Sequence, residues 1–176
     1  MHNMMTETAI QFSPEVLEKV RNIIHRFPEG KHKSALIPIL HIAQAEFDGW
    51  LSVPVMDYVA GILNILPIEV YEVASFYSMF NLKPTGKYLI EICQTSSCWM
   101  CGSEDILGYL ENKLKVEVGQ PTADGMFQIK LVECLGSCGT APMFQIGATY
   151  YENLTFEKID AILENLRKEN ERSRYC

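Results

Sequence analysis

Four cysteines occur in two closely spaced pairs and are the residues of this sequence best suited to chemistry. The first pair is Cys93 and Cys98, and the second is Cys134 and Cys138. Paired thiolates can bind zinc or an iron–sulfur cluster. Structural zinc usually takes tight pairs, whereas these pairs enclose four and three residues. The wider spacing favours a two-iron cluster, with zinc as the alternative.

Two short strands have to bring these cysteines together. A strand is expected over Lys87 to Ile92, directly before Cys93, and a helix from Ser103 follows it. A second strand is expected over Phe127 to Glu133, directly before Cys134. A strand, helix and strand in this order form a right-handed crossover with parallel strands, whose carboxyl ends meet at one edge of the sheet. We therefore expect both cysteine pairs at this edge.

The remainder of the second half predicts a small mixed sheet. Strands are expected over Met143 to Ile146 and over Thr149 to Tyr151, joined as a hairpin, and Thr155 can cap a final helix. The order β-α-β-β-β-α gives a four-stranded sheet with helices covering its faces. The polar tail from Lys168 to Cys176 is expected to fray, with Cys176 a free thiol.

The first half predicts a helical bundle. Ser13, Ser34 and Ser52 each precede apolar residues at helical spacing, and Pro67 can open a fourth helix. We expect the bundle over residues 1–82 and a second, thioredoxin-like domain over residues 83–176, which makes the protein α+β. The bundle is expected to serve as a scaffold or as a docking face for a partner.

Composition and charge exclude several classes of function. The chain has 176 residues and a net charge of −7, which argues against binding nucleic acid or anionic lipid. No signal peptide or long apolar run is evident, so we expect a cytoplasmic protein of bacterial type without direct membrane insertion. In a reducing cytosol, clustered cysteines indicate metal or redox chemistry rather than disulfides. Glycine-rich nucleotide-binding motifs are absent, so no flavin or nucleotide is expected in this chain.

The charge around the cysteines predicts a low reduction potential. Four thiolates and two sulfides outweigh two ferric irons, so an oxidised two-iron cluster is already negative. Glu91 and Glu133 lie next to the cysteine loops, and neither loop contains lysine or arginine. Adding an electron to a negative site in an acidic protein is unfavourable.

The cysteine segments resemble the thioredoxin-like [2Fe-2S] ferredoxin family found in respiratory complex I, where it is the 24 kDa component. The resemblance rests on Cys93-x4-Cys98 and on the run from Glu133 to Met143. The runs from Glu69 to Phe80 and from Tyr151 to Thr155 are also similar to that family. The resemblance covers about residues 10–168 and its motifs are highly specific.

The resemblance implies a site, a partner and a function. Cys93, Cys98, Cys134 and Cys138 would ligate one [2Fe-2S] cluster, and Pro142 would be the cis-proline of a thioredoxin-like fold. The helical half would dock on the adjacent flavin- and NADH-binding subunit, whose FMN exchanges single electrons with the cluster. The protein would thus belong to NADH:quinone oxidoreductase, peripheral on the membrane through that complex. The same module serves NAD-linked hydrogenases and formate dehydrogenases, and the sequence does not separate these assemblies.

Cys101 departs from the family pattern and leaves alternatives open. With Cys93 and Cys98 it creates the spacing of plant-type ferredoxins. With Cys98 alone it forms a C-x-x-C segment before a helix, as in thiol–disulfide oxidoreductases. We expect Cys101 to be no ligand, because Cys134 and Cys138 serve better together. A thiol–disulfide oxidoreductase using Cys98 and Cys101 and a structural zinc interaction module are the remaining alternatives.

Overall fold

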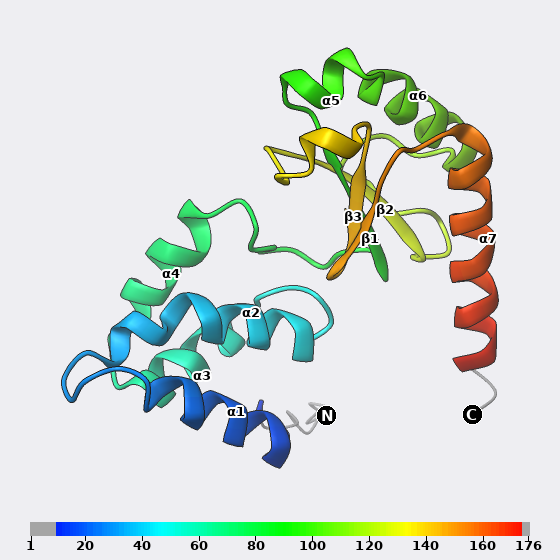
Figure 1. Ribbon diagram of the computed structural model, residues 1–176. Helices are drawn as coiled ribbons and strands as arrows, with labels where there is room; N and C mark the ends of the chain where they lie inside the picture. Colours follow the sequence, from blue (N-terminus) through cyan, green and yellow to red (C-terminus); the bar gives the residue numbers. More distant parts are fainter. Residues whose placement is uncertain (1–9, 174–176) are drawn as a thin grey trace, which may run out of the picture. The chain divides into compact units, whose positions relative to one another are not determined.

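The computed structural model describes residues 10–173, and the chain divides into two compact units between Thr85 and Gly86 (Figure 1). The first unit is helical, and the second contains the sheet. The elements of the first unit are α1 (Pro14–Ile24), a 3₁₀ turn η1 (His32–Ala35), α2 (Leu36–Glu46), α3 (Val53–Leu63) and α4 (Pro67–Phe76).

The helices of the first unit begin at the residues expected from the sequence, with one exception. Ser52 caps α3, since its side chain accepts a hydrogen bond from the Val55 N–H at 3.4 Å. Ser13 stands at the start of α1 without a capping bond from its side chain. The expectation that Ser34 caps the second helix is wrong, because Ser34 lies inside the 3₁₀ turn and α2 begins at Leu36.

One apolar cluster holds the helical unit together. Its members come from every helix of the unit, and the most deeply buried among them include Val20, Ile39, Leu40, Val59 and Val70. Burial of each such side chain contributes about 1.5–3 kcal/mol relative to leaving it exposed. The amphipathic pattern of the sequence therefore accounts for this unit.

The second unit is a mixed four-stranded sheet with helices. Its elements are β1 (Tyr88–Cys93), α5 (Ser96–Met100), α6 (Ser103–Leu114), β2 (Phe127–Val132), a 3₁₀ turn η2 (Cys138–Thr140), β3 (Phe144–Ile146), β4 (Thr149–Tyr151) and α7 (Phe156–Ser173). The strand order is β2-β1-β3-β4. β1 and β2 are parallel, with Cys93 opposite Val132, and the other two pairings are antiparallel. The α+β fold and the parallel crossover are confirmed.

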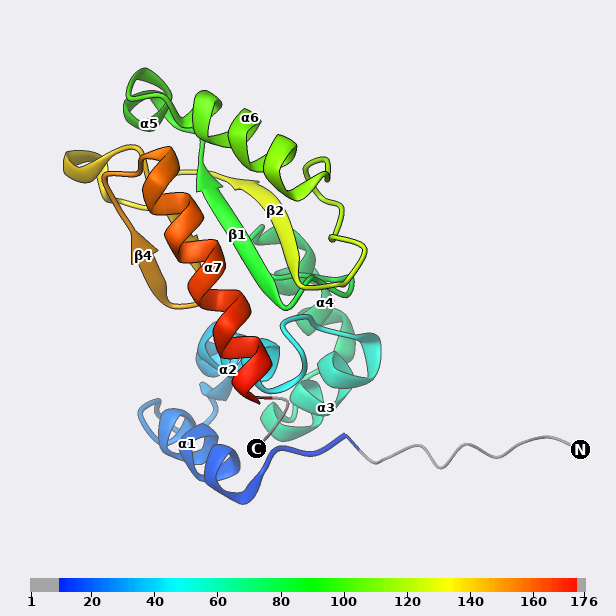
Figure 2. The same ribbon diagram turned by 90° about the vertical axis from the view of Figure 1, so that its right-hand side faces the viewer.

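The two long helices of the second unit lie on the same face of the sheet (Figure 2). Ile90 and Phe127 face them within one buried core. Between the helices, the rings of Tyr109 and Phe156 stack at 4.4 Å, and the Tyr109 hydroxyl donates to Asp160 at 2.7 Å. The expectation that helices cover both faces is therefore wrong for this unit. Alternate residues such as Glu91 belong to the opposite face, as the period of a strand requires.

Two further expectations need correction. Cys98 does not lie in a loop, because residues from Ser96 to Met100 form the short helix α5. The helix α7 continues to Ser173, so the described part of the expected tail, residues 168–173, is helical rather than frayed. An ion pair between Lys168 and Glu164, one turn apart at 2.7 Å, supports this extension. The expected free thiol at Cys176 lies outside the described residues.

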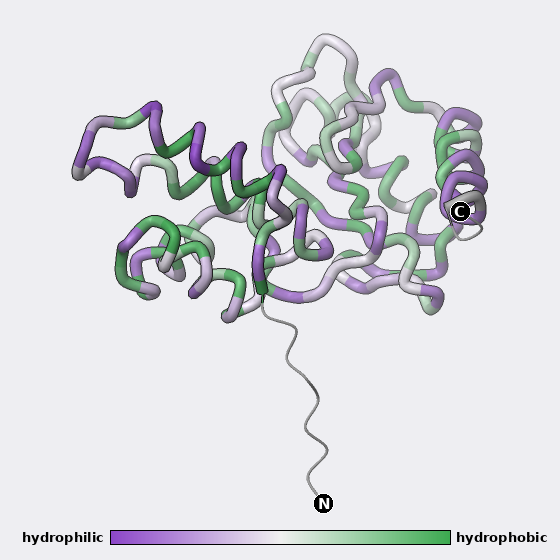
Figure 3. Tube along the Cα trace, turned by 90° about the horizontal axis from the view of Figure 1, so that it is seen from below, coloured by the Kyte–Doolittle hydropathy of each residue, from purple (hydrophilic) through white to green (hydrophobic). Residues whose placement is uncertain are grey.

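Hydropathy changes repeatedly along the helices (Figure 3). Within residues 10–173, no helix is both long enough and apolar enough to cross a membrane.

Candidate metal centre

The parallel pairing of β1 and β2 brings the two cysteine pairs to one edge of the sheet. Cys93 is the last residue of β1 and lies opposite Val132, two residues before Cys134. Leu135, within the second cysteine loop, packs against the buried cluster of Cys93, Cys98 and Met143. The two loops are therefore in direct contact, as the crossover topology predicts.

The first pair is buried. Cys93 and Cys98 are 2% and 1% exposed, and both pack against Met143, which is 1% exposed. Partly buried Leu135 and Ala141 complete this small cluster. The peptide bond between Ala141 and Pro142 is cis, which confirms the expected cis-proline beside the site.

The buried thiols differ in acidity. Burial raises the pKa of Cys98 to about 11, and its hydrogen bond to Cys93 acts in the same direction. Burial also opposes ionisation of Cys93, but hydrogen bonds from the Thr95 hydroxyl and from the Leu135 N–H outweigh it and lower the pKa of that thiol. The Cys93 sulfur lies 3.3 Å from the Thr95 Oγ1 atom. A cation bound by both sulfurs would displace the proton that Cys98 otherwise keeps.

The second pair is exposed to solvent. Cys134 and Cys138 both lie on the surface, on a loop that turns at Gly136. The φ angle of Gly136 is +78°, a conformation that favours glycine, and its N–H points to the Cys134 sulfur at 3.4 Å. Backbone N–H groups directed at sulfur stabilise thiolates and tune the potential of iron–sulfur sites.

Polar side chains hold this exposed loop in place. Ser137 and Thr140, which flank Cys138, both donate their hydroxyl hydrogens to the Glu152 carboxylate, Thr140 at 2.6 Å. These bonds lower the pKa of Glu152, the bond from Ser137 most. The Tyr150 hydroxyl donates to the Leu135 carbonyl at 2.8 Å. We call the group of Ser137, Thr140 and Glu152 the Glu152 clamp.

Two charged residues near the strand ends partly compensate each other. Glu91 belongs to β1 two residues before Cys93, and its carboxylate lies 3.5 Å from the Lys130 ammonium on β2. The two residues face each other in the register of the parallel strands. Glu91 therefore adds less negative potential at the cysteines than the sequence suggested. Glu133 is exposed and lies 3.4 Å from the Gln94 amide.

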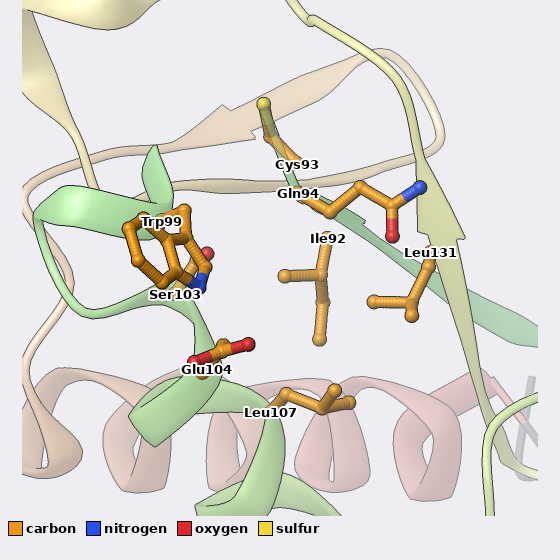
Figure 4. Close-up of a pocket in the computed structure, with 8 residues that line it drawn as sticks. All are labelled: Ile92, Cys93, Gln94, Trp99, Ser103, Glu104, Leu107 and Leu131. Atoms are coloured by element: carbon orange, nitrogen blue, oxygen red, sulfur yellow. The ribbon is translucent and has the colours of Figure 1, made fainter. Parts of the chain in front are cut away.

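A cavity of about 130 Å³ adjoins Cys93 (Figure 4). Trp99 and Glu104 line one side, and Ile92 and Leu131 from the two parallel strands line another. Trp99 is 56% exposed, so its ring covers this cavity only in part.

The donor set fits a two-iron cluster better than the alternatives. Among residues 10–173, no three cysteine, histidine, aspartate or glutamate side chains are arranged to hold one metal ion. A two-iron cluster takes two thiolates at each iron, which matches the two cysteine pairs. A nucleophilic thiol must be accessible and acidic. Cys98 is buried with a raised pKa, and the exposed thiol of the C-x-x-C segment is Cys101, which argues against a thiol–disulfide oxidoreductase.

The fold of the second unit and its two cysteine pairs place the chain in the class of thioredoxin-like iron–sulfur electron carriers. It belongs to the thioredoxin-like [2Fe-2S] ferredoxin family, whose model matches residues 20–167. The expected resemblance and its [2Fe-2S] cofactor are thereby confirmed at the level of the family.

Individual relatives are similar over nearly the whole chain. The E-type subunit of the NADH-quinone oxidoreductase of Rickettsia bellii is 43% identical over 162 residues, covering 92% of this chain and 97% of the relative. Its counterpart from Rickettsia felis is 43% identical over 157 residues, covering 89% and 94%.

A solved structure has the same fold. An NAD⁺-reducing [NiFe]-hydrogenase in the air-oxidised state matches with a TM-score of 0.65 and 24% identity. The match covers 77% of this chain and only 23% of that longer chain. At this identity the likeness concerns the fold alone.

Sequence reasoning missed the residues that hold the exposed loop. Tyr150 and Glu152 contact residues that precede them by 15 positions, and no periodicity in the sequence signals such contacts. The only signal was the similarity of the run from Tyr151 to Thr155 to the family, which assigned Glu152 no role.

Proposed function

We propose that this chain is the E-type subunit of an NADH:quinone oxidoreductase. In this role it carries one [2Fe-2S] cluster on Cys93, Cys98, Cys134 and Cys138. The cluster supplies one-electron redox chemistry, exchanging single electrons with the flavin of an adjacent NADH-binding subunit. The observation that carries the proposal is the packing of Leu135, from the second cysteine loop, against the buried cluster that contains Cys93 and Cys98 at the end of β1.

The chain's own residues have separate tasks in this proposal. The cluster of Met143, Leu135 and Ala141 excludes water from the first cysteine pair. The Gly136 N–H donates a hydrogen bond to the Cys134 sulfur at 3.4 Å. Such donors stabilise negative charge on sulfur and raise a cluster potential. The net charge of −7 acts in the opposite direction, so we expect a potential below zero volts.

The helical unit is proposed to dock on the flavin-binding subunit. Several large apolar side chains are exposed in this unit, at Val53, Leu66, Ile68 and Phe76, with exposures of 56%, 66%, 55% and 80%. A partner that covered these side chains would remove their apolar surface from water, which favours association. The rings of Phe76 and Tyr77 pack edge to face at 5.1 Å, so the two aromatic side chains lie together where a partner could contact both. Attachment to a membrane would then come through the assembled complex.

Purification of the native assembly tests this proposal. The full chain, purified without oxygen, should show two iron and two sulfide per chain and an EPR signal of a reduced [2Fe-2S] cluster. A tagged chain should co-purify with an FMN-containing, NADH-oxidising subunit. A colourless protein with one zinc, or a chain that reduces protein disulfides, would contradict the proposal.

A hydrogenase or formate dehydrogenase assembly is the second candidate. An NAD⁺-reducing hydrogenase has a similar fold, but this similarity alone does not assign the chain to a hydrogenase assembly. The 43% identity to two E-type subunits over almost their whole length favours the quinone-reducing complex. Co-purification of a nickel-containing or formate-oxidising subunit would decide for the second candidate.

A further inference from the structure

We propose that Glu152 is a positioning residue that keeps the cluster potential low by holding the loop around Cys138. It binds the hydroxyls of Ser137 and Thr140, so that neither hydroxyl donates to the cluster. The inference rests on the proposed ligand set and goes beyond it, because Glu152 itself ligates nothing.

The geometry of the Glu152 clamp supports this role. Both hydroxyls donate to the same carboxylate oxygen, and Ser137 and Thr140 also lie 2.7 Å apart between their hydroxyl oxygens. Ser137 directly precedes Cys138 and Thr140 follows it by two positions. One carboxylate thus fixes the loop on both sides of an exposed cysteine. The Asn153 N–H, next to Glu152, adds a bond to the Thr140 carbonyl at 2.7 Å.

The second cysteine pair needs such a device because packing does not hold it. The apolar cluster that encloses Cys93 and Cys98 includes neither Cys134 nor Cys138. Hydrogen bonds from hydroxyls to a charged carboxylate are stronger than those between neutral groups. The Glu152 clamp can therefore fix a loop that lies in water.

The clamp has two effects on the potential, and both have the same sign. A carboxylate close to the cluster loop disfavours the addition of an electron. Hydroxyls that donated to cluster sulfurs would favour it, and Glu152 withholds such donors. The effect is largest for the Ser137 hydroxyl, because the Thr140 hydroxyl also faces the Ser137 carbonyl at 3.1 Å. Loss of the carboxylate should therefore raise the potential through two separate contributions. One is the removal of its negative charge, and the other is the release of the hydroxyls.

A series of variants of the cluster-loaded full chain separates these effects. Glu152→Gln removes the charge but keeps an oxygen acceptor, whereas Glu152→Ala also releases the hydroxyls. The triple variant with Glu152→Ala, Ser137→Ala and Thr140→Val removes the released donors. Glu171→Gln, at an exposed site near the end of α7, removes the same charge without affecting the clamp. The midpoint potential and the EPR g-values of the reduced cluster are measured for each variant.

We expect the wild type to have the lowest midpoint potential, Glu152→Gln a higher one, and Glu152→Ala the highest. The triple variant should return to the potential of Glu152→Gln, and Glu171→Gln should match the wild type. Potentials and g-values unchanged in Glu152→Ala would overturn the inference. So would a potential in the triple variant equal to that of Glu152→Ala, because the hydroxyls would then play no part.

Loss of the cluster from a variant would also test the inference. If Glu152→Ala keeps its far-UV circular dichroism but not its iron, while Glu152→Gln keeps both, the positioning role is supported, and Glu152→Gln then tests the effect on potential. Equal iron loss in Glu152→Ala and Glu171→Gln would overturn the inference. If the wild-type chain itself binds no [2Fe-2S] cluster, the proposed function fails, and this outcome is distinct from a failure of the clamp.

Discussion

The two cysteine pairs are held by different physical means. Cys93 and Cys98 are almost inaccessible and are fixed by the packing of Met143 and its neighbours. Cys134 and Cys138 are exposed, and their loop is fixed by hydrogen bonds with Tyr150 of β4 and with Glu152, which follows that strand. Close packing ties the first pair to the rest of the folded core, whereas each hydrogen bond at the surface contributes only about 0.5–1.5 kcal/mol to stability. Folding should therefore preform the first pair, and the second pair should remain adjustable.

This difference suggests separate tasks for the two halves of the site. The buried pair excludes water and provides a fixed anchor. The exposed pair lies where a partner or solvent can influence it, and where charges such as that of Glu152 act on the potential.

Replacing one buried thiol should have the largest effect. In the cluster-loaded full chain, Cys98→Ser removes a proposed ligand and leaves Cys93 without its partner, so we expect loss of most of the iron and of the visible spectrum. Cys101→Ser is the matched control, because Cys101 is the exposed thiol three residues away. It should keep the full cluster. A cluster that survives Cys98→Ser but not Cys101→Ser would replace the proposed ligand set with one that includes Cys101.

Removing the packing around the buried pair should have the next largest effect. Met143→Ala deletes a side chain that is 1% exposed, which costs about 2–5 kcal/mol. Because the chain has two units, the measurement is native-state amide exchange in β1, which reports opening of the sheet unit.

Met100→Ala is the control for that experiment. Met100 is 79% exposed, so its loss should change the opening free energy by less than about 0.5 kcal/mol. Equal effects of the two substitutions would contradict the view that packing holds the first pair.

The difference between the pairs also determines what could be predicted from the sequence. The strand before each cysteine pair and the parallel crossover followed from local patterns, so the meeting of the pairs at one edge could be predicted. Burial of Cys98 in the helix α5 could not, because five residues give too short a pattern to indicate a helix. The contacts of Glu152 join segments that pair only after the sheet has formed, and a one-dimensional pattern does not contain them.

Removing the iron should distinguish the pairs directly. On anaerobic chelation of the full chain, amide exchange over residues 134–140 should accelerate about tenfold more than over residues 93–98, a difference of about 1.4 kcal/mol in opening free energy. The reason is that packing persists around the first pair, whereas the second loses its bonds to the cluster. The loop over residues 119–125, which carries none of the cysteines, provides an internal reference whose exchange should not change. Similar acceleration in both cysteine segments would mean that the cluster holds both pairs.

The smallest expected effect concerns a single hydrogen bond to the exposed loop. Tyr150→Phe removes the bond from the Tyr150 hydroxyl to the Leu135 carbonyl, at 2.8 Å, and leaves the ring in place. Such a bond contributes about 0.5–1.5 kcal/mol, and the 45% exposure of Tyr150 favours the lower end. We therefore expect the rate of cluster release to a chelator to rise about twofold to fivefold, by a change of this size in the loop-opening equilibrium.

Tyr151→Phe is the matched control, since the neighbouring ring keeps its packing against Phe144 at 5.4 Å. Its cluster should be released at the wild-type rate. If the two phenylalanine variants release iron equally fast, the hydroxyl of Tyr150 does not restrain the loop. The Glu152 clamp would then be the main restraint, and Glu152→Ala should accelerate release more than Tyr150→Phe does. Additive effects in the double variant would show that the two restraints act independently on opposite ends of the loop, whereas a smaller combined effect would show that they fix the same movement.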